Sequence, residues 1–95
     1  MDKWQLINES IDSRAEELCA LSDAIWDKPE LAFTEENAAK LLSEALEKEG
    51  FAVERNVANI ETAFTGTFGN GRPVIGILGE FDALSVLSQV ADCAE

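Results

Sequence analysis

Apolar residues recur at helical spacing along the first quarter of the chain. Between Lys3 and Asp27 they form one stripe at intervals of three, four and seven residues. This spacing predicts a single long amphipathic helix packed against a sheet. The stripe consists of Trp4, Ile7, Ile11, Leu18, Leu21 and Ile25. Pro29 ends the helix, because the residue before a proline is disfavoured in the helical conformation.

A second helix is predicted after Thr34, which has the side chain of an N-cap residue. Glu35 and Glu36 would lie in its first turn, where negative charge complements the helix dipole. The helix runs to about Glu49, and Gly50 follows where a C-terminal glycine cap is expected. Its inner face would be formed by Ala38, Leu41, Leu42, Ala45 and Leu46.

Two short segments after this helix have the pattern of strands. Phe51 to Val57 is rich in apolar and β-branched residues, and the segment Phe64 to Phe68 alternates apolar and small polar side chains. Gly69-Asn70-Gly71 is typical of a tight turn. We expect this turn to join the second segment to another strand that begins at Pro73, as a hairpin.

The segment from Val74 to Leu84 predicts a buried strand, because it is apolar at nearly every position up to its end. Two carboxylates follow its apolar part, Glu80 and Asp82. Side chains two residues apart in a strand share a face, and ligands of α/β sheets bind beyond the carboxyl ends of strands. Glu80 and Asp82 therefore predict a site for a metal ion or for proton transfer.

Composition and charge narrow the classes of partner. The chain has 95 residues, of which 46% are hydrophobic, enough for one small domain. Nineteen acidic residues against seven basic ones give a formal net charge of −12, which repels nucleic acids and anionic membrane surfaces. The sequence has neither a signal-peptide pattern nor an apolar run near the ~18 residues of a membrane span. We expect a cytoplasmic protein.

The sequence contains no histidine, so it offers no Ser-His-Asp or Cys-His arrangement for catalysis. Its two cysteines, Cys19 and Cys93, are too few and too far apart to predict a disulfide framework. Cys19 is expected to be a partly buried free thiol on the first helix. Cys93 has no basic neighbours that would activate it as a nucleophile.

The order of elements predicts an α/β fold with two helices, then a strand hairpin and a buried strand. The last strand would lie at the edge of a narrow sheet, where its unpaired backbone groups favour further pairing. We therefore expect that the chain is the opening portion of a larger fold or that it forms a homo-oligomer.

Three motifs occur in an order that resembles a known family. They are Pro29-Glu30-Leu31-Ala32-Phe33-Thr34-Glu35, Gly50-Phe51-Ala52-Val53, and Gly79-Glu80-Phe81-Asp82-Ala83-Leu84 with Leu87-Ser88-Gln89. Together they resemble the N-terminal part of the zinc-dependent metallopeptidases, which include carboxypeptidases, aminoacylases and N-acyl amino-acid amidohydrolases. The resemblance implies that residues 1–95 are an incomplete N-terminal portion of a three-layer catalytic domain.

The family implies hydrolysis of an amide bond next to a free carboxylate, in an N-acyl amino acid or an aminobenzoyl-glutamate-like substrate. It also implies two zinc or manganese ions in the complete protein. Asp82 matches an aspartate that orients a metal ligand, and Glu80 occupies the place of a ligand histidine, where the amidohydrolase branch often has an acidic residue. Ser85 departs from the proline that usually follows. Cys93 lacks the Gly-His context of the family cysteine.

We therefore expect Asp82 and Glu80 to be catalytic-site residues of a metal-dependent amidohydrolase. This chain would be a part of that enzyme, and we expect it to be inactive and to bind no metal by itself. One alternative is a non-catalytic acidic module that binds a basic partner or adds a strand from it. Another is a calcium or magnesium site formed only by carboxylates, although such ions need several oxygen ligands together.

Overall fold

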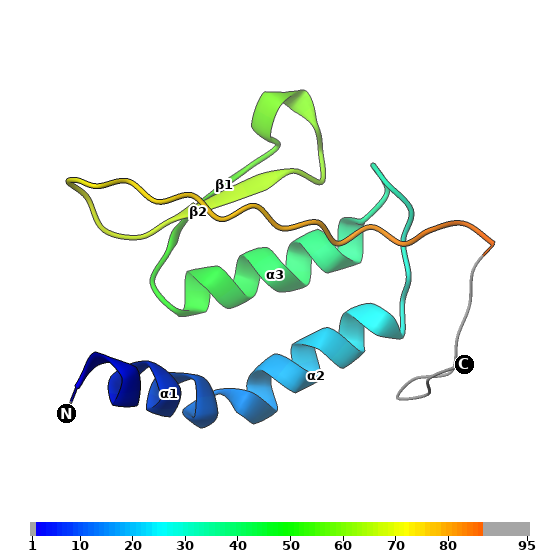
Figure 1. Cartoon of the computed structure of the whole chain (residues 1–95). Coiled ribbons are helices and arrows are strands. Elements are labelled where there is room, and N and C mark those ends of the chain that lie inside the picture. The colour runs from blue at the N-terminus through cyan, green and yellow to red at the C-terminus, as the bar shows by residue number, and fades with distance from the viewer. Residues whose placement is uncertain (1, 87–95) are drawn as a thin grey trace.

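The computed structural model describes residues 2–86 of the chain (Figure 1). In this part, helices precede a two-stranded antiparallel sheet, which confirms the expected α/β class. The elements are α1 (Lys3–Ser13), α2 (Ala15–Trp26), α3 (Glu36–Lys48), β1 (Ala52–Arg55), the short 3₁₀ helix η1 (Val57–Asn59) and β2 (Phe64–Thr67). No helix among the described residues has both the length and the apolar character needed to cross a membrane.

The elements form layers around α3. Figure 1 shows α3 between the α1–α2 pair on one side and the β1–β2 hairpin on the other. Contacts join α2 to α3, and α3 to both strands. The apolar stripe of the first helices was predicted to pack on a sheet, and this is wrong, because the sheet packs on α3. Ile7, Ile11 and Leu18 consequently remain about half exposed.

The predicted single helix is interrupted at Arg14. The carbonyl oxygen of Ser10, which would accept from the Arg14 N–H in a continuous helix, accepts instead from the Ser13 hydroxyl at 2.9 Å and from Nη1 of Arg14 at 3.2 Å. The Arg14 N–H donates to the carbonyl of Ile11 at 3.0 Å. Side chains that compete for helical carbonyls in this way bend helices. The chain therefore forms α1 and α2 as separate helices.

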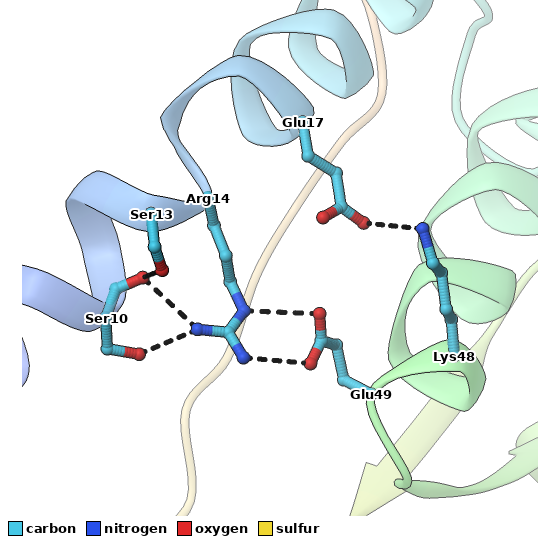
Figure 2. Close-up of polar contacts among 6 residues, drawn as sticks. All are labelled: Ser10, Ser13, Arg14, Glu17, Lys48 and Glu49. Carbon is cyan, nitrogen blue, oxygen red and sulfur yellow. Dashed lines mark hydrogen bonds and ion pairs between the residues drawn. The ribbon is translucent and has the colours of Figure 1, made fainter.

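Ion pairs connect these helices to the end of α3 (Figure 2). The Arg14 guanidinium donates to both carboxylate oxygens of Glu49, at 3.2 and 3.1 Å. Lys48 Nζ lies 3.4 Å from Glu17 Oε1. The hydrogen bonds and charge of Arg14 lower the pKa of the Glu49 carboxyl group. All four side chains are substantially exposed to solvent, so these ion pairs contribute little to the free energy of folding.

Helix α3 begins differently from the sequence-based prediction. Its N-cap residue is Glu35, whose side chain makes no capping bond, and the Thr34 hydroxyl donates to the carbonyl of Leu31 at 2.8 Å. The capping acceptor is Glu30, whose two carboxylate oxygens each accept from a backbone N–H, of Asn37 and Ala38, at 2.9 Å. These bonds satisfy two of the N–H groups that a helix start leaves without intrahelical partners.

Small residues on α3 form the most buried part of the described structure. Ala38 and Ser43 are each 1% exposed, whereas the larger apolar side chains of the predicted inner face are only partly buried. The Ser43 hydroxyl accepts from Arg55 on β1 at 3.1 Å, and Arg55 also pairs with Glu47 at 2.6 Å. Gly50 follows α3 with a φ of 95°, which confirms the predicted glycine cap.

The sheet confirms two predicted strands and corrects their pairing. Strand β1 pairs with β2 in antiparallel register, with Ala52 opposite Thr67 and Arg55 opposite Phe64. The chain reverses after β2 near Gly69 and Gly71, both with positive φ (Figure 1). However, the described residues from Pro73 to Val86 form no strand, so the predicted hairpin across this turn is wrong.

The segment from Val74 to Leu84 is extended but not buried. Figure 1 shows it as a yellow-to-orange trace without a strand arrow. Val74, Ile75, Ile77 and Leu78 are between 81% and 96% exposed. The prediction of a buried strand is therefore wrong for the described residues. The physical reason is that β1 and β2 pair with each other, and nothing in residues 2–86 covers the segment's apolar faces.

Replacement of Ala38 by leucine tests whether α3 is tightly packed. Ala38→Leu should destabilise the chain by about 1–3 kcal/mol, because a buried site without free space must distort to accept a larger side chain. The matched control is Ala20→Leu on the exposed face of α2, which should change stability by less than about 0.5 kcal/mol. Urea unfolding followed by circular dichroism measures both, and equal effects would contradict the described packing.

The carboxylates of Glu30, Glu47 and Glu49 predict a loss of stability in acid. Hydrogen bonds to backbone N–H groups lower the pKa of Glu30, and hydrogen bonds to arginine lower the pKa of Glu47 and Glu49, all from an ordinary 4.5. Because the unfolded chain binds protons more readily, the stabilisation is present above that value and is lost as pH falls through the lowered pKa values. Thermal unfolding between neutral pH and about pH 3 should show this loss.

A glutamine variant separates the contribution of Glu30 from those of the other two carboxylates. Glu30→Gln should make the melting temperature less dependent on pH, whereas Glu9→Gln, at an exposed position inside α1, should leave the dependence nearly unchanged. An unaltered pH dependence in Glu30→Gln would show that the Glu30 bonds do not form in solution.

Candidate functional site

Two motifs that are distant in sequence lie beside each other in the structure. The N–H of Ala83 donates to the carbonyl of Glu30 at 2.7 Å, and Leu31 and Ala83 form an isolated parallel β-bridge. Figure 1 shows the orange end of the extended segment passing the cyan loop that leads into α3. The Pro29–Glu35 motif and the Gly79–Leu84 motif therefore meet at this bridge.

The residues around the two candidate carboxylates alternate in exposure. Phe81 and Ala83 are partly buried, whereas Glu80 and Asp82 are exposed. This alternation is typical of an extended chain whose successive side chains point to opposite sides. Phe81 lies against Phe64 of β2, with ring centroids 5.9 Å apart. Asp82 therefore lies between two residues that contact other parts of the fold. Phe81 packs against Phe64 of β2, and Ala83 is bonded to Glu30 in the loop between α2 and α3, called the Glu30 loop below.

Glu30 is the residue that sequence reasoning did not identify. Its carboxylate holds the start of α3 through Asn37 and Ala38, while its backbone carbonyl holds Ala83. The two N–H groups are also the main reason why the pKa of Glu30 is lowered, so the side chain is ionised at neutral pH. The feature of the sequence that could have indicated this role is a glutamate directly after a proline that follows one helix, a few residues before the next helix begins.

The described residues do not by themselves fit a metal ion. Among residues 2–86, no three His, Cys, Asp or Glu side chains come close enough to hold one. Glu80 and Asp82 offer carboxylates, but a zinc site usually needs three or four protein ligands, and calcium needs six or more oxygens. Cys19 is a free and exposed thiol on α2, more exposed than predicted. Cys93 and the Leu87–Gln89 motif lie outside the described residues.

A surface cavity of about 310 Å³ lies elsewhere, between α3 and the segment around Thr62. Its walls include side chains of both charges, Lys40 and Arg55 with Glu44. Thr62 is 6% exposed, and its hydroxyl lies 3.2 Å from the carboxylate of Glu35. Glu80 and Asp82 do not line this cavity.

Two curated proteins are similar to this chain. A subunit of the p-aminobenzoyl-glutamate hydrolase of Escherichia coli (strain K12) is 47% identical over 92 residues, which cover 97% of this chain and 19% of that protein. The human Xaa-Arg dipeptidase is 38% identical over an alignment 90 residues long, and the match covers 80% of this chain and 20% of that protein. The chain thus spans about a fifth of the length of the curated relatives that it matches. No family model and no solved structure matches it.

Both relatives are named for hydrolysis, and both match along most of the chain rather than at one motif. A match over 97% of the chain includes both the loop after α2 and the segment with Glu80 and Asp82. These matches confirm the resemblance that the motifs indicate: over nearly its whole length, this chain is similar to proteins of peptidase family M20.

Proposed function

We propose that this chain is part of a hydrolase that cleaves an amide bond next to a free carboxylate. The observation that carries the proposal is the 47% identity to the E. coli p-aminobenzoyl-glutamate hydrolase subunit across 97% of the chain. A similarity that extends along the whole chain indicates a shared fold and a shared place in a larger protein, which an isolated motif would not.

The names of the two relatives define a common substrate chemistry. In p-aminobenzoyl-glutamate, an amide joins an aromatic acyl group to the nitrogen of glutamate, whose α-carboxylate is free. In an Xaa-Arg dipeptide, the amide nitrogen likewise belongs to a residue with a free α-carboxylate. We therefore infer that the substrate class of the complete protein is N-acyl amino acids, with the acyl group left open.

Within such an enzyme, this chain would form one part of the catalytic domain and would contribute two residues to the catalytic site. Asp82 and Glu80 are the residues that we assign to the catalytic site, Asp82 as the group that orients a metal ligand. The complete protein would require a pair of zinc or manganese ions, with most ligands outside this chain, since the described residues do not fit a metal alone. The chain by itself would be inactive.

The hydrolase hypothesis explains more of the observations than the alternative, an acidic module that binds other proteins. A module of that kind needs only net negative charge and an accessible backbone edge. It gives no reason for sequence identity to a hydrolase and a dipeptidase along the same segment. The exposed apolar residues of the Val74–Leu78 segment are also explained if further chain covers them in the complete enzyme.

A chimeric enzyme tests the proposed function. This chain replaces the matching segment of the E. coli subunit, the hydrolase is assembled with the chimeric subunit, and release of p-aminobenzoate from p-aminobenzoyl-glutamate is measured with and without a chelator. The chimera should hydrolyse the substrate in a chelator-sensitive way, whereas the isolated chain should not. Asp82→Asn should lower the rate by about 10–100-fold, the range found when a group that orients a metal ligand is removed.

The matched control for this variant is Asp23→Asn on the exposed face of α2, which should retain the activity of the chimera. A chimera that folds with the circular dichroism of the E. coli protein but does not hydrolyse the substrate would overturn the proposal. Full activity of Asp82→Asn would overturn the assignment of Asp82.

A further inference from the structure

Glu30 makes two kinds of contact at once, and they reach different parts of the fold. Its carboxylate binds the first free N–H groups of α3, and its backbone carbonyl binds the N–H of Ala83, directly after Asp82. The contacts are short, at 2.9 Å for the side chain and 2.7 Å for the backbone. Asp82 is thus one residue away from a group that is fixed to the start of a helix.

Most of the extended segment before Asp82 has no such attachment within residues 2–86. Residues 74–80 are all exposed, and in this part of the chain the bonds between backbone groups outside helices and the β1–β2 ladder include none from them. Phe81 contacts Phe64 through its side chain, with ring centroids 5.9 Å apart. Among residues 2–86, the bond between the Ala83 N–H and the Glu30 carbonyl is the backbone hydrogen bond nearest to Asp82.

We propose that Glu30 is a positioning residue for Asp82. The Glu30 carboxylate fixes the Glu30 loop to the start of α3. This fixes the position of the Glu30 carbonyl, which binds the N–H of Ala83 and so positions the backbone of the preceding residue, Asp82. The effect on Asp82 as a site residue rests on the proposed hydrolase function, whereas the mechanical link between α3 and Ala83 does not. A positioning residue of this kind never touches the substrate.

Amide hydrogen exchange of the 95-residue chain tests the link directly. In the unaltered chain, the N–H groups of Asn37, Ala38 and Ala83 should be protected. In Glu30→Ala, all three should exchange about fivefold faster or more, a factor consistent with the loss of a helix cap. In Glu30→Gln the increase should be smaller, because the side-chain amide keeps one accepting oxygen.

Two references show whether the effect is local. The N–H of Leu42, in the middle of α3, should keep its protection in both variants, and Glu36→Ala should leave Ala83 unchanged. If Glu30→Ala unfolds the chain, Glu30→Gln decides the question. Three results would overturn the proposal: an unprotected Ala83 in the unaltered chain, faster exchange at Asn37 and Ala38 without any change at Ala83, or equal acceleration at Leu42 and Ala83.

The chimeric enzyme supplies the second measurement. Glu30→Gln should lower kcat for p-aminobenzoyl-glutamate while KM stays nearly constant, because the residue acts through Asp82 and not on the substrate. Glu36→Ala should change neither constant. An increase in KM alone would overturn the positioning role. If the unaltered chimera is inactive, the hydrolase proposal fails, and the exchange result still decides whether Glu30 links α3 to Ala83.

Discussion

Packing on α3 from two opposite sides is the constraint on which the described structure depends. The helix receives α2 on one side and both strands on the other, and its most buried residues, Ala38 and Ser43, are small. Small side chains allow close approach, and polar bonds then complete the attachment. Arg55 connects β1 to Ser43 and Glu47, while Glu49, directly after the last residue of α3, pairs with Arg14. Without α3, the first two helices and the hairpin would have no common partner.

The start of α3 extends this role toward the candidate site. A helix start exposes N–H groups that need acceptors, and here an acceptor comes from a loop rather than from the cap residue itself. The loop that provides Glu30 is also the one that pairs with Ala83. Secondary structure, loop and extended segment are therefore connected by one side chain, and the position of Asp82 follows from the position of the helix.

The sequence predicted elements whose signals are local. The second helix, its glycine cap at Gly50 and the two short strands were foreseen, because periodicity and turn residues act over a few positions. The break at Arg14 was missed, since it comes from side chains that compete for the Ser10 carbonyl. The capping role of Glu30 was missed because it spans seven residues and requires a loop conformation that no spacing rule gives. The pairing of β1 with β2 depends on the whole fold.

The open face of the Val74–Leu78 segment has a consequence for the behaviour of this chain in solution. Four large apolar side chains that are almost fully exposed, in an extended backbone, are a template on which further chains can stack into aggregates. The net charge of −12 opposes this, because like-charged molecules repel one another. Acid removes that protection by protonating the carboxylates. Colloidal stability of this chain is therefore a property of its charge, and it will be greatest in neutral buffer of low ionic strength.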